Sequence, residues 1–339
     1  MSAAMDPNTT PALSPPDGVS PNFTDPFTIH PAEVIVSSLS LALCTVFVAA
    51  HMYTRVSIMK AFGLTDCALL VSYATFTAYA AVAIYDGRYG QGTHQWDVTL
   101  ADFLKLQQPL NVLEILYSPV VFGAKYVVLR QIETIFFEHR RKHLAYRVIR
   151  TLIWANLIFY TAIMFVFIFA CVPRERIWNP TVDGHCIDTT AAIVGSGTIN
   201  LVSDFTILVV PIAAVLNLKI PLKKKIGVAA VFAVGILANI ASILKLYYSI
   251  KLTQTQDITF AISHVGFASF AEITSIILVA CVPQFPRIVR QLRQQTTTQS
   301  TYPKAGTGRK DISEYMQDPS GIQLSGRGMN DSTTALRVA

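Results

Sequence analysis

Five charged side chains interrupt long apolar stretches of the sequence and are the residues best placed to do chemistry: Glu114, Lys125, Asp204, Lys245 and Glu272. A charged group at the centre of a bilayer costs about 2.5–3.5 kcal/mol even on insertion scales, so such groups usually pair inside a bundle or mark a pathway. Counting depth at about 1.5 Å per residue, we expect Lys125 to pair with Asp204 and Glu114 to pair with Lys245. These ion pairs could simply lock the bundle. Glu272 is left near mid-membrane without a partner at its depth, which makes it the strongest candidate for a functional group.

A carboxyl group among apolar helices can keep a proton available, because burial disfavours its charged form. Protonated Glu272 could start the cyclisation of a polyene or terpene, and Asp204 could then stabilise the resulting cation. These two residues are the catalytic candidates if the protein is an enzyme. The sequence contains no recognisable Cys/His metal site, glycine-rich phosphate loop or Ser-His-Asp arrangement, so we expect neither a metal nor another cofactor.

Seven apolar stretches are long enough to hold these charged residues inside a membrane. A span needs about 20 mostly apolar residues, and the chain is 52% hydrophobic and only 14% charged, against about 25% charged residues in a soluble domain. The predicted fold class is therefore all-α, a seven-helix transmembrane bundle in contact with the lipid bilayer. The expected spans are 33–53, 65–85, 109–130, 151–172, 190–216, 226–250 and 262–282.

Basic residues between alternate spans predict the orientation of the bundle, because Lys and Arg near span ends favour the cytoplasmic side. With the N-terminus outside, the inner segments hold 15 Lys and Arg and the outer segments hold five. We therefore expect a multi-pass protein of the plasma membrane or an endomembrane, with a cytoplasmic C-terminus. The basic inner loops suit anionic lipid or a cytoplasmic signalling partner. The net charge of +6 comes without a DNA- or RNA-binding motif, so nucleic acid is not an expected partner.

Polar segments flank the expected membrane domain, residues 33–283. Residues 1–32 are predicted to be an extracytoplasmic disordered tail and residues 284–339 a cytoplasmic one, because both are polar and low in bulky apolar residues. Asn8 and Asn22 begin Asn-x-Thr triplets and would be glycosylation acceptors on the outer side. The stretch 287–293 has a weak amphipathic pattern that suits the inner surface of the bilayer.

The loop between the second and third spans contains the run Tyr-Gly-Gln-Gly-Thr-His-Gln-Trp-Asp, in which two glycines permit a tight turn. His94 and Asp97 could join Asp183 and His185 of the next outer loop around a divalent metal, but their spacing is not a ligand signature. A structural role is favoured instead. We expect Trp96 to sit at the lipid interface, with His94 and Asp97 hydrogen-bonding within the loop.

This loop contains the first of several motifs that come in a fixed order along the chain. They are Gly-x-His-x-Trp-Asp at 92–97, Leu-Tyr followed by Lys125, Cys-x-Pro…Trp…Cys at 171–186, Ser203-Asp204 leading to Pro211, Lys245, and Glu272 followed by Cys281-Val282-Pro283. Together these motifs resemble the fungal rhodopsin-domain integral membrane proteins, which include satratoxin-cluster membrane proteins and receptor-like proteins of appressorium signalling. The resemblance covers about residues 33–290 and implies a receptor-like membrane protein.

Three positions depart from the pattern of that family. Val127 and Thr134 stand where a Ser and the Arg of an aromatic-Arg pair are usual, and Lys245 stands where an Arg is more usual. If this region contacts a cytoplasmic partner, the departures put that contact in doubt for this chain.

Two of the five cysteines face the predicted oxidising side, and these are Cys171 and Cys186. We expect a disulfide between them that folds the second outer loop over the mouth of the bundle. The alternative is two free thiols. The remaining cysteines lie within spans, where they act as small packing residues: Cys44, Cys67 and Cys281.

Two classes of function remain open from the sequence. The first is a seven-span receptor of the G-protein-coupled type for an extracellular or small lipophilic ligand, although the chain lacks Asp-Arg-Tyr after the third span and Asn-Pro-x-x-Tyr in the seventh. The seventh span also lacks a Lys for a retinal Schiff base. The second, which the resemblance implies because some members of that family are associated with biosynthetic clusters, is a membrane-embedded acid–base enzyme, such as a cyclase, or a carrier in secondary-metabolite biosynthesis. A passive structural role is the third alternative.

Overall fold

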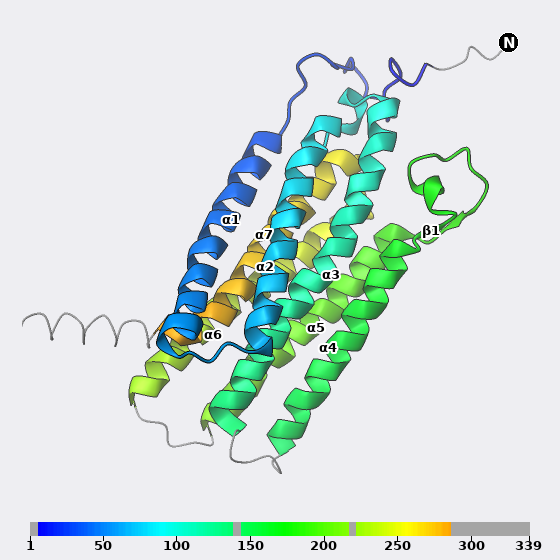
Figure 1. The fold of residues 1–339 in the computed structure, drawn as a ribbon. Helices are drawn as coiled ribbons and strands as arrows, with labels where there is room; N and C mark the ends of the chain where they lie inside the picture. Colours follow the sequence, from blue (N-terminus) through cyan, green and yellow to red (C-terminus); the bar gives the residue numbers. More distant parts are fainter. Residues whose placement is uncertain (1–5, 138–143, 217–221, 286–339) are drawn as a thin grey trace, which may run out of the picture. The chain divides into compact units, whose positions relative to one another are not determined.

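The computed structural model describes residues 6–137, 144–216 and 222–285, all of which belong to one compact unit, Met1–Arg293. Within these residues seven helices are long and apolar enough to cross a membrane, which confirms the predicted fold class (Figure 1). The helices are α1 (His30–Tyr53), α2 (Leu64–Asp86), α3 (Leu100–Phe137), α4 (Leu144–Ile168), α5 (Thr189–Leu216), α6 (Leu222–Leu252) and α7 (Ile258–Cys281).

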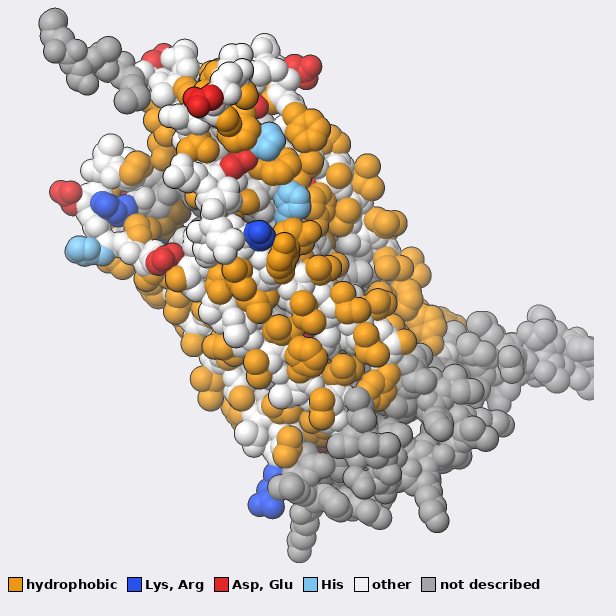
Figure 2. Space-filling view, turned by 180° about the vertical axis from the view of Figure 1, so that it is seen from behind, with side chains coloured by type: hydrophobic (Ala, Val, Ile, Leu, Met, Phe, Trp, Pro, Cys, Tyr) orange, Lys and Arg blue, Asp and Glu red, His pale blue; other side chains and the backbone are white. Residues whose placement is uncertain are grey.

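The lipid-facing surface and the core divide along the faces of these helices. In the most apolar window of each helix, α7 and α3 bury 67% and 56% of their residues, whereas α1 and α4 bury 22% and 17%. Large apolar side chains on the peripheral helices point outward, including Ile35 of α1 and Ile158 of α4, which are 65% and 66% exposed. Figure 2 shows the resulting hydrophobic flank, with the acidic and histidine side chains of this face toward one end and basic side chains visible at both ends. Helices α3 and α7 therefore form the centre of the bundle.

The short elements cluster at the end of the bundle that carries the N-terminal segment, which we call the N-terminal end. They comprise the 3-10 turns η2 (Gly87–Tyr89), η3 (Gln95–Asp97) and η4 (Arg174–Ile177) and the two-residue strands β1 (Cys171–Val172) and β2 (His185–Cys186). A π-helical turn, η1 (Thr54–Ile58), and a 3-10 turn, η5 (Val282–Gln284), follow α1 and α7. Several basic residues of the expected inner side lie outside the described residues. Among them are Arg140, Lys219 and the basic residues of the stretch 287–293.

The described part of the N-terminal segment, from residue 6, contacts the start of α3, although its composition predicts a disordered tail. Leu100 and Ala101 begin α3, and their backbone N–H groups donate to the carbonyls of Thr10 and Pro7 at 2.9 and 3.0 Å. The first N–H groups of a helix have no partner within the helix, so the N-terminal segment acts as a cap. Thr99 completes this cap by accepting the Asp102 N–H at 3.2 Å. Composition alone does not reveal such docking, because the segment buries little apolar surface.

This cap also explains why α3 starts earlier than expected. The predicted third span begins at residue 109, whereas α3 begins at Leu100 and continues through Pro109 and Pro119 to Phe137. The residues before Pro109 are polar enough to resemble a loop. They become helical because Thr99 and the N-terminal segment satisfy the exposed backbone N–H groups.

A buried cluster of charged side chains lies at the C-terminal end of α1. Asp66, which is 1% exposed, accepts a hydrogen bond from Arg55 Nε at 3.0 Å and lies 3.0 Å from His51 Nε2. Its carboxylate also accepts the Gly63 N–H that precedes α2 at 2.9 Å. Arg55, one of the basic residues that predict the orientation, is therefore neutralised within the described structure.

Helices α2 and α3 approach closely at Gly123. A Cβ atom added there would lie 2.9 Å from Ser72 Cβ and 3.2 Å from the Ala68 carbonyl oxygen. We expect Gly123→Ala to lower the free energy of unfolding by about 1–3 kcal/mol, because the extra methyl group overpacks the contact. Thermal unfolding of the purified protein in detergent measures the change.

Gly195 of α5 provides the matched control, because a Cβ atom added there meets nothing within 4 Å. Gly195→Ala should leave the unfolding temperature unchanged or raise it, since alanine is favoured over glycine in a helix by about 0.5–1 kcal/mol. Equal unfolding temperatures for the two variants would contradict the close approach of α2 and α3.

Candidate functional site

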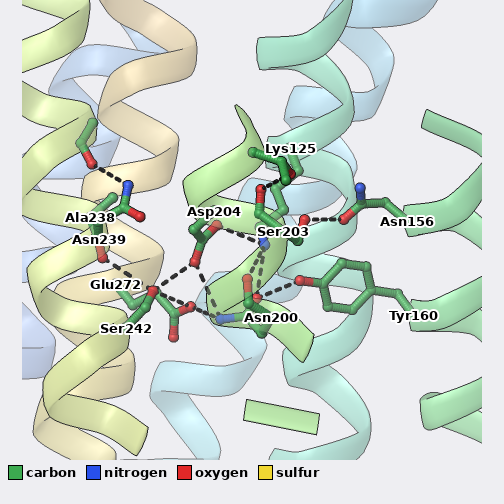
Figure 3. Close-up of polar contacts among 12 residues, drawn as sticks. Lys125, Asn156, Tyr160, Asn200, Ser203, Asp204, Ala238, Asn239, Ser242 and Glu272 are labelled. Carbon is green, nitrogen blue, oxygen red and sulfur yellow. Dashed lines mark hydrogen bonds and ion pairs between the residues drawn. The ribbon is translucent and has the colours of Figure 1, made fainter. Parts of the chain in front are cut away.

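Polar side chains from five helices meet in the centre of the bundle, and we call this group the buried polar network. Figure 3 shows most of its members. Polar side chains are tolerated inside an apolar helix bundle only where they form hydrogen bonds or ion pairs with one another. The spacing of the members places them on single helix faces, for example Asn200 and Asp204 one turn apart on α5. The network consists of Tyr117 and Lys125 of α3, Tyr160 of α4, Asn200 and Asp204 of α5, Ser242 and Lys245 of α6, and Glu272 of α7.

Lys125 pairs with Asp204, as the depth estimate predicts. Lys125 Nζ lies 2.7 Å from Asp204 Oδ1 and donates to Asn200 Oδ1 at 2.8 Å. The Lys125 residue is 1% exposed and Asp204 is 6% exposed. Asp204 also accepts a hydrogen bond from Ser242 Oγ at 2.7 Å. The ammonium is thus neutralised and surrounded by acceptors, which is the condition for keeping a charge in a bilayer interior.

Glu272 is 0% exposed and has four partners rather than none. Its carboxylate accepts hydrogen bonds from Tyr117 Oη and Ser242 Oγ, both at 2.9 Å, and from Asn200 Nδ2. Lys245 Nζ lies 3.5 Å from its Oε2 atom. The polar environment of Glu272 is therefore complete, and its carboxylate is tied to α3, α5 and α6.

The expected pairing of Glu114 with Lys245 is corrected by this geometry, because Lys245 forms its ion pair with Glu272. Lys245 Nζ also lies 3.2 Å from the centroid of the Tyr117 ring, a cation–π contact. Depth along the membrane axis placed Glu114 and Lys245 at the same level but could not give the rotation of α6 about its axis. That rotation brings Lys245 to α7.

Glu114 consequently has no hydrogen bond or ion pair among the described residues, although the Lys245 charge acts on it. Its side chain lines a cavity of about 300 Å³ at the N-terminal end of the bundle. We call this space the loop-covered cavity. Helices α3, α5 and α7 form most of its walls, and the residues Ala170–Ile187 contribute Cys171, Arg176 and Cys186.

The walls of the loop-covered cavity are mainly apolar, and polar side chains make up about a third of the lining residues. Leu110, Ile193 and Ile262 are among the apolar residues, and Glu114 and Arg176 bring charges of opposite sign. Arg176 is already engaged, because its guanidinium donates to the Val182 carbonyl. A cavity of this size and character matches small-molecule sites, which are typically about 300–1,000 Å³ and mostly apolar with a few orienting polar groups.

Glu114 also connects this cavity with the buried polar network. A second cavity, of about 10 Å³, is lined by Glu114 together with Tyr117, Tyr160, Asn200 and Lys245. The space around Lys125 and Asp204 is also small, with a cavity of about 50 Å³. Among the cavities enclosed by described residues, the one of about 300 Å³ is thus lined by Glu114, whereas those beside Lys125, Asp204 and Lys245 are too small for an organic molecule.

The disulfide between Cys171 and Cys186 is confirmed, with the two Cα atoms 4.0 Å apart. Strands β1 and β2 pair antiparallel at the same two cysteines, and Val172 pairs with His185. The disulfide and the two-residue sheet close the second loop at its base. The loop thereby covers one side of the cavity, as expected from the sequence.

The first loop, residues 87–99, is docked onto the start of α7. His94 Nδ1 lies 2.6 Å from Asp257 Oδ2, and its ring stacks between Trp96 and Phe260 at centroid distances of 4.4 and 4.2 Å. Asp97 instead accepts the Asn22 N–H at 2.8 Å. The expected hydrogen bonds of His94 and Asp97 within the loop are corrected by these contacts, because their partners, Asp257 and Asn22, lie outside the loop. Asn8 and Asn22 are exposed, and their glycosylation stays a prediction.

A buried hydroxyl strengthens the same docking, and its removal gives a test. Thr259 is 1% exposed and donates to the Thr93 carbonyl at 2.7 Å. Thr259→Val keeps the shape but leaves that carbonyl without its donor, so we expect a loss of about 1–3 kcal/mol in local stability. Hydrogen–deuterium exchange should become faster in residues 87–99.

Thr253→Val is the matched control, because Thr253 is exposed and its hydroxyl bonds only the Ile250 carbonyl one turn earlier. Exchange in residues 87–99 should match the unmodified protein in this variant. If Thr259→Val exchanges equally slowly there, the hydroxyl does not hold the loop.

Several residues of the buried polar network are uncharged, so a search for charged residues in the spans does not find them. Asn200 bridges Lys125, Tyr160 and Glu272, and Ser242 bridges Asp204 and Glu272. Uncharged polar residues are common in membrane helices. The one sequence signal for Asn200 is its position one helical turn before Asp204, on the same face of the helix. Nothing in the sequence near Asp257 indicates its contact with His94, 163 residues away.

Comparisons with known proteins agree with the architecture. The family model described as the fungal rhodopsin domain matches residues 50–291. A "SAT4 family membrane protein" of Emericella nidulans is 36% identical over 213 residues, covering 63% of this chain and 54% of that relative. The chain thus spans about half the length of this relative.

Two relatives are named after biosynthetic clusters. "Fugralins biosynthesis cluster protein 2" of Gibberella zeae is 27% identical over 353 aligned positions, covering 96% of this chain and 88% of the relative. "Satratoxin biosynthesis SC1 cluster protein 4" of Stachybotrys chartarum is 31% identical over 86 residues, covering 25% of this chain and 32% of the relative.

Proposed function

The chain belongs to the fungal rhodopsin domain family of multi-pass membrane proteins, and on that premise we propose that it is a receptor-like protein that binds a small, mostly apolar ligand in the loop-covered cavity. The observation that carries the proposal is the position of Glu114, which lines both this cavity and the small cavity beside Lys245. One carboxylate thus links a ligand-sized space to the polar centre of the bundle.

The chemistry of the cavity indicates the kind of ligand. Its walls are mainly apolar, and Glu114 is a carboxyl group with no hydrogen-bonding partner among the described residues. A buried polar group without a partner is costly, so a ligand that offers Glu114 a hydrogen-bond donor or a positive charge would gain affinity. The ligand is therefore an amphiphile whose apolar body fills the cavity and whose polar end meets Glu114.

The buried polar network offers a way to pass binding on to the helices. Lys245 is attracted by both Glu114 and Glu272, and its ion pair with Glu272 is 3.5 Å long. A ligand that neutralises Glu114 removes one of these attractions and strengthens the pull of Lys245 toward α7. A receptor requires that its ligand bind one conformational state more tightly than the other, because a ligand shifts an equilibrium only through this difference in affinity. The cytoplasmic partner would bind the basic loops at the opposite end.

The second candidate function is a role in secondary-metabolite biosynthesis, which the names of two relatives favour. Glu272 is poorly placed to act as an acid on a substrate, because Tyr117, Asn200, Ser242 and Lys245 surround its carboxylate. An acid–base enzyme or a carrier would have to use Glu114 and the loop-covered cavity instead.

Deletion of the gene in the fungus, followed by return of single variants, separates the two candidates. Metabolite profiles and the cAMP response to extracts of the growth medium are compared between strains. The receptor proposal expects loss of the cAMP response with metabolites retained. Loss of one product together with accumulation of its precursor, at an intact cAMP response, overturns the proposal in favour of biosynthesis.

Matched variants connect the result to the cavity. Ile262→Trp fills the loop-covered cavity, whereas Ile240→Trp adds the same volume on the lipid-facing side, where Ile240 is 48% exposed. We expect the first variant and Glu114→Gln to abolish the response and Ile240→Trp to retain it. A normal response in Ile262→Trp, at normal expression, would remove the cavity from the mechanism.

A further inference from the structure

A second pocket lies outside the bundle, where α6 turns into α7. It has a volume of about 350 Å³ and is lined by Tyr247, Tyr248, Lys251, Asp257, Phe260 and His264, among others. The candidate spans end at Leu252 and resume at Ile258, so the turn between them lies at a bilayer surface. We call this space the interface pocket. It shares no lining residue with the loop-covered cavity.

Aromatic rings form the walls of the interface pocket. The ring centroids of Tyr247 and Tyr248 are 5.3 Å apart, those of Tyr248 and His264 are 5.4 Å apart, and those of Phe260 and His264 are 5.3 Å apart. Tyr247 remains 52% exposed. Aromatic faces arranged in this way attract cations, and quaternary ammonium groups in particular.

Two charges of opposite sign complete the pocket without neutralising each other. Asp257 is held in place by His94 and by the Gln95 N–H at 2.8 Å. Lys251 is exposed, forms no ion pair among the described residues, and lies 5.9 Å from the Tyr247 ring centroid. The pocket thus has one carboxylate, positioned by the first loop, beside the aromatic rings and one positive group at its edge.

The surface below the pocket is suited to hydrocarbon. Ile240, Leu244 and Tyr247 recur at helical spacing on α6 and are 48%, 46% and 52% exposed. This stripe runs from the middle of α6 to the interface pocket. A molecule with a zwitterionic end and apolar chains therefore matches both the pocket and the stripe.

We propose that the interface pocket binds the head group of a phosphatidylcholine molecule from the surrounding bilayer. The phosphate lies at Lys251, the quaternary ammonium lies against the rings of Tyr248 and Phe260 beside Asp257, and the acyl chains follow the α6 stripe. Because Asp257 also anchors His94, the bound lipid contacts the same residue that docks the first loop. The proposal is independent of any ligand in the loop-covered cavity.

Native mass spectrometry of the full-length protein tests the site by titration with phosphatidylcholine, phosphatidylethanolamine and phosphatidylglycerol. We expect one phosphatidylcholine to bind about tenfold more tightly than either other lipid, because neither offers both a quaternary ammonium and a matching net charge. Tyr248→Leu should remove the preference over phosphatidylethanolamine. Equal affinities for the three lipids in the unmodified protein overturn the proposal.

Lys251→Gln is the variant for the phosphate, and Lys105→Gln is its control. Both lysines are exposed, but Lys105 lies on α3 and pairs with Asp102 at 3.2 Å. Lys251→Gln should weaken the tight phosphatidylcholine site about tenfold, and Lys105→Gln should leave it unchanged. Both substitutions are on the surface, so folding is retained. An equal effect of the two substitutions places the lipid elsewhere and overturns the proposal.

Discussion

Replacing Lys125 by methionine is expected to destabilise the bundle by about 3–5 kcal/mol, the cost of leaving one buried charge without its partner. Lys125 neutralises Asp204 at 2.7 Å, and Asp204 shares the Ser242 hydroxyl with Glu272. Without the ammonium, two carboxylates remain around one hydroxyl with only Lys245 to compensate. The free energy of unfolding, or the fraction of folded protein after heating in detergent, should fall accordingly.

The partner variant, Asp204→Asn, should be less damaging. It leaves the Lys125 ammonium with the Asn200 oxygens as acceptors, at 2.8 and 3.3 Å, and with Glu272 nearby as a counter-charge. Lys125→Met combined with Asp204→Asn should recover most of the loss, because neither uncompensated charge remains. A double variant as unstable as Lys125→Met would contradict the pairing.

Lys105→Met is the control for the loss of a lysine at the protein surface. Lys105 pairs with Asp102 at 3.2 Å, but the two side chains are 59% and 40% exposed. Surface ion pairs contribute only about 0–1 kcal/mol. The comparison of the two lysines therefore measures the effect of the environment on the same kind of substitution.

Removal of the disulfide is expected to have the second-largest effect. Cys171 and Cys186 are separated by 15 positions, and a closed loop of that length corresponds to about 3 kcal/mol in the chain-entropy model. Two-residue strands cannot hold the loop by themselves. We expect Cys171→Ser with Cys186→Ser to lower the unfolding temperature and to speed hydrogen–deuterium exchange in residues 173–185.

Cys67→Ser is the matched control, because Cys67 of α2 is a free cysteine that is exposed, in contrast to the packing role expected from the sequence. It should leave both measurements unchanged. Treatment of the unmodified protein with a reductant should reproduce the double serine variant. If exchange in residues 173–185 stays slow in both cases, the loop is held by contacts other than the disulfide.

The pairing of charges shows how far a sequence argument reaches inside a membrane. Depth along each span predicted that Lys125 meets Asp204, and the two are in contact. The same reasoning paired Lys245 with Glu114, whereas Lys245 reaches Glu272. Depth depends only on the position along a helix, which the apolar pattern gives. Contact also depends on the rotation and tilt of each helix, which side-chain packing decides.

The N-terminal segment shows a similar division. Its polar composition predicts disorder, yet the carbonyls of Pro7 and Thr10 cap α3. Capping depends on a few backbone atoms that arrive at the right place, and composition carries no signal for them. The docking of His94 onto Asp257 is of the same kind, since it joins the first loop to a helix start more than 160 residues away.

The sequence by itself therefore determined the class of the protein, the number of its spans, the disulfide and one of the two ion pairs. These features follow from local composition, from span length and from positions along single helices, which a bilayer constrains strongly. Tertiary structure alone decided that Glu272 is enclosed by partners and that Glu114 faces the loop-covered cavity. The physical reason is that access and pairing depend on how helices rotate against one another, and that rotation results from packing across the whole bundle.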